Sequence, residues 1–153
     1  MAAAAYFETV QKIYIAFYQR PADPAGLKYW AEQIDLAGGN PNAVITAFGT
    51  QPESIALYGE VTAANIGTVL DKIYQAAFSR TPAEAEKAYW TEQFNAGGIT
   101  ASSMALAVVL GAQNADAASV TNKLTVANEF TAQVDGRALT DAAFGTAPFA
   151  VTY

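Results

Sequence analysis

The sequence contains no histidine and no cysteine among its 153 residues. Histidine is the usual general acid or base near neutral pH, and histidine and cysteine are the usual protein ligands of transition metals. Nucleophilic catalysis by serine also needs a nearby base. These absences argue against a metalloenzyme and against a hydrolase of the serine or cysteine class.

Positive charge is scarce as well. Lys and Arg total 8 against 14 Asp and Glu, which gives a formal net charge of -6. Nucleic-acid backbones and anionic lipid surfaces attract basic proteins, so this balance argues against both as partners. The longest apolar run, residues 104–112, is far shorter than the roughly 20 residues that span a bilayer. We therefore expect no nucleic-acid partner and no transmembrane segment.

Carboxylates are the only remaining candidates for catalysis. Glu32 with Asp35, or Glu84 with Glu86 and Glu92, could form an acid–base pair of the kind that glycosidases use. Charged residues on a helix, however, ordinarily form only a solvated face. The sequence also has no glycine loop for phosphate and no calcium-binding loop. We therefore expect a protein that is not an enzyme and whose present domain holds no cofactor or metal ion.

What the sequence does contain is a series of helical patterns separated by glycine and proline. Aromatic and aliphatic residues recur at helical spacing over residues 6–20 and again over residues 62–78. Four residues stand where helix N-caps are expected, two of them with further support from the next residues: Asp23, Thr81, Thr100 and Asp116. Alternation at period two is confined to residues 148–153. The pattern predicts an all-α fold with about six to eight helices.

One stretch occurs twice, sixty positions apart. RPADPAGLKYWAEQ at residues 20–33 returns as RTPAEAEKAYWTEQ at residues 80–93. Helical units that are too small to bury their own apolar faces pack against one another. We therefore expect a helical domain over residues 1–136, made of two pseudo-repeats at residues 6–59 and 62–136, and a C-terminal extension or linker over residues 137–153.

The repeated residues permit two interpretations. In the first, the two tryptophans, Trp30 and Trp90, belong to the core. The arginines that precede each motif, Arg20 and Arg80, then only anchor turns. In the second, Tyr and Trp offer the flat faces and polar tips that suit a sugar. The candidate ligand-binding residues are then Tyr18, Arg20, Asp23, Tyr29, Trp30, Tyr89 and Trp90. We expect the contact on the turn at residues 19–28 or in a groove between the two halves.

The first copy resembles a small family of helical repeats that is known as a domain of unknown function. The family motif joins a tyrosine-rich helix to Arg-x-x-Asp-x-x-Gly-Leu-x-x-Trp. The matching residues are Arg20, Asp23, Gly26, Leu27, Tyr29 and Trp30. The second copy keeps three of them, as Arg80, Tyr89 and Trp90. It has Ala83, Glu86 and Lys87 in place of the Asp, the Gly and the Leu.

Such repeats are similar to those at the N-termini of acidic, cysteine-poor proteins exported by type I secretion, including Caulobacter-type surface-layer (S-layer) proteins. In those proteins an N-terminal helical domain anchors the lattice by binding the O-antigen of lipopolysaccharide, and a calcium-binding C-terminal part forms the lattice. The resemblance implies an extracellular anchoring domain at the bacterial cell surface. Its partners would be lipopolysaccharide or a related polysaccharide and other copies of the parent protein, with calcium only in the rest of that protein.

The resemblance also accounts for a start without a Sec signal peptide, because type I signals lie at the far C-terminus. Two alternatives stay open. One is a module for protein–protein assembly within an exported surface protein. The other is a cytosolic helical adaptor, which fits the missing signal peptide equally well.

Overall fold

The computed structural model describes residues 3–140 of the chain, and the side chains of residues 3–134. This part of the chain contains eight α-helices and no strand, which confirms the all-α prediction. The helices are α1 (Phe7–Ile13), α2 (Pro24–Leu36), α3 (Asn42–Ile45), α4 (Pro52–Tyr58), α5 (Ile66–Phe78), α6 (Glu84–Asn95), α7 (Ala101–Leu110) and α8 (Asn114–Thr140). Three short helical segments extend them: the 3-10 turns η1 (Ala3–Tyr6) and η3 (Thr46–Thr50), and the π-helical turn η2 (Tyr14–Tyr18).

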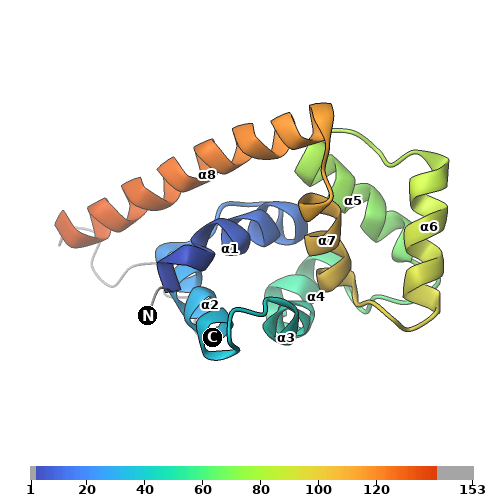
Figure 1. Ribbon diagram of the computed structural model, residues 1–153, viewed down its shortest axis with the longest axis horizontal. Coiled ribbons are helices and arrows are strands. Elements are labelled where there is room, and N and C mark those ends of the chain that lie inside the picture. Colours follow the sequence, from blue (N-terminus) through green and yellow to red (C-terminus); the bar gives the residue numbers. More distant parts are fainter. Residues whose placement is uncertain (1–2, 141–153) are drawn as a thin grey trace.

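The two repeats have the same local design. In the first, η1, α1 and η2 form one continuous helical stretch that is followed by α2 (Figure 1). In the second, α5 is followed by α6. Gln19 and Ser79 end the first helix of each repeat with φ angles of 60° and 57°. Such left-handed conformations are uncommon for residues other than glycine, so their recurrence supports a structural repeat.

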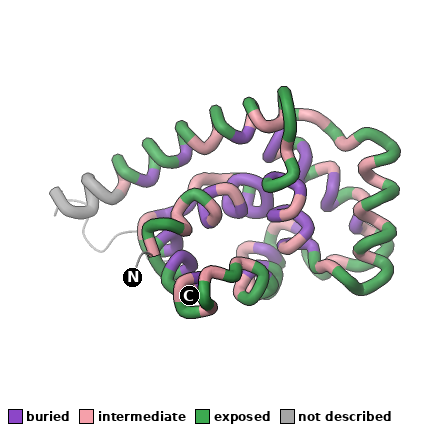
Figure 2. Tube along the Cα trace, viewed as in Figure 1, coloured by how far each residue is buried: buried purple, intermediate pink, exposed green. Residues whose placement is uncertain are grey.

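A single core lies where η2, α5 and α7 meet. Figure 2 shows these segments as buried, in contrast to the outer sides of α6 and α8. The largest side chains in the core with less than 2% exposure include Tyr14, Phe17, Phe48, Leu70, Ile73, Met104 and Leu106. Burial of each such aliphatic or aromatic side chain contributes about 1.5–3 kcal/mol. Because both repeats supply these residues, neither repeat has a complete core without the other.

Helix α8 runs across the molecule and packs on α1 and α5 (Figure 1). A fully buried glutamine, Gln11, joins it to the first repeat. Its Nε2 donates to Thr131 Oγ1 at 2.7 Å and to the carbonyl of Ala127 at 3.3 Å, and its Oε1 accepts from the N–H of Ala22 at 2.9 Å. Buried polar groups need such partners, so Gln11 specifies where α8 lies.

Two of the predicted N-caps are confirmed. Asp23 Oδ1 accepts from the N–H of Gly26 at 2.8 Å at the start of α2. Thr100 Oγ1 accepts from the N–H of Ser103 at 3.2 Å at the start of α7.

The other two predicted caps are wrong. Helix α6 begins at Glu84, in the same register as α2 in the first repeat, so Ala83 rather than Thr81 holds the cap position. Glu86 compensates, because its Oε2 accepts from the N–H of Ala83 at 2.7 Å. Helix α8 begins at Asn114. Asp116 lies in its first turn and is held by a long-range ion pair with Arg80 instead.

The predicted domain boundary at residue 136 falls within α8, which continues to Thr140. The rest of the predicted extension, including the alternating tail, lies outside the described residues. Within the described part of the chain, no helix combines the length and the apolar character that a membrane crossing requires.

Candidate functional site

Arg20 holds the turn between η2 and α2. Its Nε and Nη2 donate to the two carboxylate oxygens of Glu53 at 2.6 and 2.8 Å. Its guanidinium lies 5.0 Å from the centre of the Tyr14 ring. Burial opposes its charge, but the hydrogen bond and the charge of Glu53 outweigh this and raise the pKa of Arg20. Asp23, which is buried, lies 3.5 Å from Nη1. Both candidate residues are therefore engaged in the turn and in the cap of α2.

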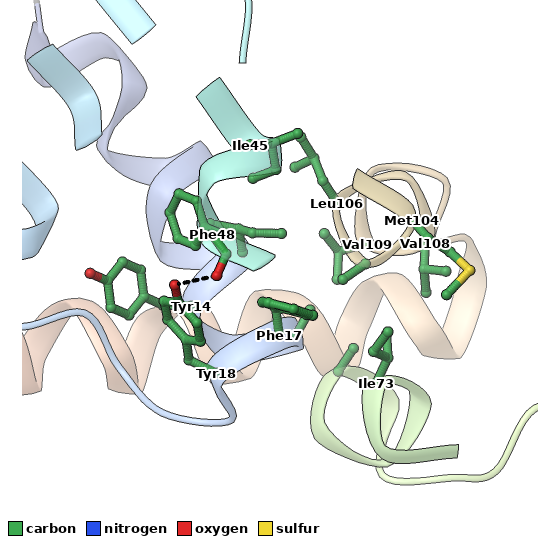
Figure 3. Close-up of a cluster of buried hydrophobic side chains, with 14 of the residues drawn as sticks. Tyr14, Phe17, Tyr18, Ile45, Phe48, Ile73, Met104, Leu106, Val108 and Val109 are labelled. Atoms are coloured by element: carbon green, nitrogen blue, oxygen red, sulfur yellow. Dashed lines mark hydrogen bonds between the residues drawn. The ribbon is translucent and has the colours of Figure 1, made fainter. Parts of the chain in front are cut away.

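Three aromatic residues of the first copy, Tyr14, Tyr18 and Trp30, pack around Phe48 of η3. Figure 3 shows Phe48 with Tyr14 and Tyr18. The centre of the Phe48 ring lies 4.4 Å from that of Trp30 and 5.3 Å from that of Tyr18. The Tyr18 hydroxyl also donates to the Phe48 carbonyl at 3.0 Å. Tyr18 and Trp30 are each only 3% exposed. The prediction that these two residues offer an exposed face is therefore wrong, because Phe48 covers them.

In the second copy, two carboxylates hold the arginine. Nε and Nη2 of Arg80 donate to Asp116 at 3.0 and 2.7 Å, and Nη1 and Nη2 donate to Glu86 at 2.8 and 2.9 Å. The hydrogen bonds with Asp116 and Glu86 raise the pKa of Arg80. In return, the hydrogen bond from Arg80 holds the pKa of Glu86 below its usual range. One positive and two negative charges leave this cluster with a net charge of -1.

An open groove of about 390 Å³ lies beside this cluster, between α5, α6 and α7. Its lining includes four aromatic residues and both carboxylates: Tyr74, Phe78, Tyr89, Trp90, Glu86 and Asp116. Tyr89 is 54% exposed and Trp90 is half-buried. The Trp90 Nε1–H donates to the Tyr74 hydroxyl at 3.0 Å, which fixes the indole ring against α5. The groove therefore combines aromatic surfaces with hydrogen-bond acceptors.

At the position that corresponds to Phe48 of the first copy, the second copy has the smaller Val108. The two residues are sixty positions apart, which is the offset of the repeat. Val108 lines the groove together with Tyr74, Phe78 and Trp90. These three are the counterparts of the residues that Phe48 contacts in the first copy. A valine lacks the ring that would fill this space.

The outer helices of the two repeats, α2 and α6, also differ in how far they are buried. Helix α2 buries five residues, whereas α6 buries none. Helix α2 is covered by η1 and α8, while α6 packs mainly on α5. Figure 2 accordingly shows α6 with exposed and half-buried residues along its whole length. The second copy is thus accessible to a ligand in a way that the first is not.

A larger open groove, of about 800 Å³, lies between the two repeats and is bordered by η2, α5 and α8. Arg20 and Gln19 reach it from the first turn, but none of the motif aromatic residues lines it. The structure thus separates the predicted site residues. Tyr89 and Trp90 line the groove of the second copy, Arg20 lines the groove between the repeats, and Tyr29 lies 37% exposed on the surface.

Three residues that shape these sites were not recognised from the sequence: Glu53, Asp116 as an arginine partner, and Val108. Glu53 and Asp116 follow their arginines by 33 and 36 positions. A search for carboxylates at similar distances after each arginine would have found both. Comparison of the two copies beyond the motif itself would have drawn attention to Phe48 and Val108.

In the described part of the chain, no group of three acidic residues comes together in a way that could hold a metal ion. Glu86 and Asp116 lie close to each other only around Arg80, whose guanidinium is paired with both carboxylates.

Residues 50–117 match the model of a family described as a domain of unknown function, DUF4214. The matched span contains α4 to α7 and ends one residue after Asp116, so it includes every residue that lines the groove of the second copy. The motif of the first copy, at residues 20–30, lies outside it. No curated protein and no solved structure matches the chain. The relationship to S-layer proteins stays a prediction.

Proposed function

We propose that this domain is a non-enzymatic glycan-binding module and that the groove of the second copy is its binding site. The observation that carries the proposal is the pair Tyr89 and Trp90 at an open groove, whereas in the first copy the equivalent tryptophan, Trp30, is buried against Phe48. Sugars present flat C–H faces and hydroxyl groups, and exposed Tyr and Trp rings suit the first of these.

The polar groups of the groove suit a neutral sugar. Glu86 and Asp116 are acceptors, and each ionised carboxylate has about four lone-pair sites. Arg80 uses some of these sites, and the others can accept from sugar hydroxyls. A net charge of -1 in the cluster disfavours glycans that carry carboxylate, phosphate or sulfate groups.

The wider role that we propose is attachment of a larger exported protein to the bacterial cell surface. The proposed partner is the O-antigen of lipopolysaccharide or a related polysaccharide, and the proposed parent is an S-layer or similar surface protein. This part rests on the resemblance of the motif residues to those of exported surface proteins. The acidic composition, which gives no attraction to anionic lipid, is compatible with attachment through a glycan.

The test uses a matched pair of variants, Tyr89→Ala and Tyr29→Ala. Both tyrosines precede the motif tryptophan and lie edge-on to it with ring centres 4.9 Å apart. We expect the first variant to lose about tenfold in retention on cells that bear lipopolysaccharide, because a contact of about 1.4 kcal/mol corresponds to that factor. We expect Tyr29→Ala to bind like the unsubstituted domain, because Tyr29 lines neither groove.

Circular dichroism establishes that both variants are folded before binding is compared. Equal retention of folded Tyr89→Ala and of the unsubstituted domain would mean that the glycan binds elsewhere. The unsubstituted domain could instead bind neither cells nor neutral oligosaccharides and sediment as a concentration-dependent oligomer. That result would favour the alternative of a protein–protein assembly module.

A further inference from the structure

The groove between the repeats has a chemical character of its own. Its base is formed by aliphatic side chains from three separate segments, including Ile15 of η2, Ala76 of α5 and Ala127 of α8. Val126 also lines the groove and is 68% exposed. At about 800 Å³, the groove lies in the size range of small-molecule sites.

Two lysines, Lys72 and Lys123, line this groove from α5 and α8. Within the described part of the chain, neither ammonium group has a carboxylate partner. Lys72 Nζ donates to the carbonyl of Leu57 at 3.1 Å. Lys123 Nζ donates to the carbonyls of Ala76 at 2.6 Å and Gln75 at 3.5 Å.

Four other cationic side chains of the described residues do have carboxylate partners. Lys12, Arg20, Arg80 and Lys87 each pair with at least one carboxylate. The other charged residues that line the groove are Arg20 and Asp71, and each is paired, Arg20 with Glu53 and Asp71 with Lys87. Among the described residues that line the groove, Lys72 and Lys123 therefore supply the positive charge that no carboxylate offsets. An ammonium group has three N–H donors, so Lys72 retains two and Lys123 retains one for a ligand. Burial also lowers the pKa of Lys123, and a bound anion would oppose that effect.

We infer that the groove between the repeats binds an aliphatic carboxylate, with the hydrocarbon chain on the apolar base and the carboxylate at Lys72 and Lys123. The class follows from the lining. The apolar part of the lining is aliphatic and includes no aromatic ring. It offers a hydrocarbon chain a place to leave water but offers a sugar no stacking surface. The ammonium groups donate charge-assisted hydrogen bonds to a carboxylate. This site is separate from the proposed glycan site and does not depend on it.

The experiment is an NMR titration of the ¹⁵N-labelled domain with octanoate, octanamide and acetate. Octanamide keeps the chain without the charge, and acetate keeps the charge without most of the chain. We expect octanoate to bind about tenfold more tightly than either, because both the charge and the chain contribute. The largest chemical-shift changes should fall on the backbone amides of Ile15, Ala76 and Val126.

Two double variants test the role of the lysines. Lys72→Gln with Lys123→Gln should reduce octanoate binding to the level of octanamide. Lys12→Gln with Lys28→Gln removes the same charge from residues that do not line this groove, and it should leave the preference for octanoate intact. If the first double variant fails to fold, Lys72→Gln alone replaces it, because Lys72 is exposed. This single variant should lose part of the preference for octanoate over octanamide.

Three results would overturn the inference. The first is equal affinity for octanoate and octanamide in the parent domain. The second is a preference for octanoate that survives loss of both groove lysines. The third is octanoate binding that leaves the chemical shifts of the groove amides unchanged, or no detectable binding at millimolar octanoate. None of these results bears on the glycan site, because Tyr89 and Trp90 line a different groove.

Discussion

The two copies of the repeat contain the same Tyr-Trp pair in almost the same local geometry, yet they use it differently. The ring centres lie 4.9 Å apart in both, with interplanar angles of 78° and 75°. In the first copy Trp30 is 3% exposed, whereas in the second Trp90 lines a groove. The sequence of a motif thus determines how its residues meet one another. What covers the motif determines whether they can meet a ligand.

The difference is produced by a few neighbouring residues. Phe48 fills the space next to Trp30, and Val108 leaves the equivalent space next to Trp90 open. At another repeat-related position, Gln11 is buried and bonded to α8, while Asp71 pairs with Lys87 nearer the surface. Both copies contribute to the core, but the outer helix of the first copy is buried in part, whereas that of the second buries no residue.

The strongest test of this contrast is the cost of removing each tryptophan. Equivalent core residues would lose similar stability on truncation. Because Trp30 is buried, Trp30→Ala should lower the free energy of unfolding by about 3–5 kcal/mol. Trp90 is half-buried, so Trp90→Ala should cost only about 1–2 kcal/mol, since less apolar area leaves water on folding. Urea denaturation measures both, and equal losses would contradict the account.

A second, smaller contrast is expected between Gln11 and Asp71. Gln11→Ala removes the acceptor of the Ala22 N–H and the donor to Thr131 Oγ1, so we expect a loss of about 1–3 kcal/mol. Asp71→Ala breaks only a partly exposed ion pair, for which we expect a change within about 1 kcal/mol. The same denaturation experiment applies. A neutral Gln11→Ala variant would mean that α8 is held in place by its other contacts, such as the hydrogen bond from Thr131 to the Ala22 carbonyl, without help from Gln11.

The smallest expected effect is the pH dependence of the Arg80 cluster. The pKa of Glu86 is lowered in the folded protein, chiefly by its hydrogen bond with Arg80. A lowered pKa stabilises the fold above the ordinary Glu pKa of about 4.3, and this contribution is lost as the pH falls through the lower folded-state value. The difference in the free energy of unfolding between the unsubstituted domain and Glu86→Gln should therefore shrink from neutral pH to acidic pH. A difference that stays constant down to pH 3 would contradict this.

Much of the fold could be predicted from local signals. The start of α2 at Asp23 and of α7 at Thr100 follows from cap residues that act over three positions. The caps predicted at Thr81 and Asp116 failed because distant or competing contacts decide there. Glu86 replaces the missing cap side chain at Ala83, and Arg80 engages Asp116 across 36 positions.

The candidate site was predictable only in part. Exposed aromatic residues were expected from the motif, and the structure leaves Tyr89 and Trp90 accessible. Burial of Tyr18 and Trp30 depends on Phe48, which comes from η3 and meets them only through tertiary packing. Periodicity identifies which face of a helix is apolar, but it does not indicate which of two similar faces a partner covers.

The proposed glycan site is tested most directly by giving the second copy the residue of the first. Val108→Phe adds the ring that closes the equivalent space beside Trp30, while Tyr89, Trp90 and the Arg80 cluster stay in the chain. Ala107→Leu, at another lining position of the same groove, serves as an independent filling variant. The measurement is retention of the folded variants on cells that bear lipopolysaccharide. Loss of retention in both variants, with binding unchanged in Tyr29→Ala, is the predicted result, and undiminished retention by folded Val108→Phe would contradict the account.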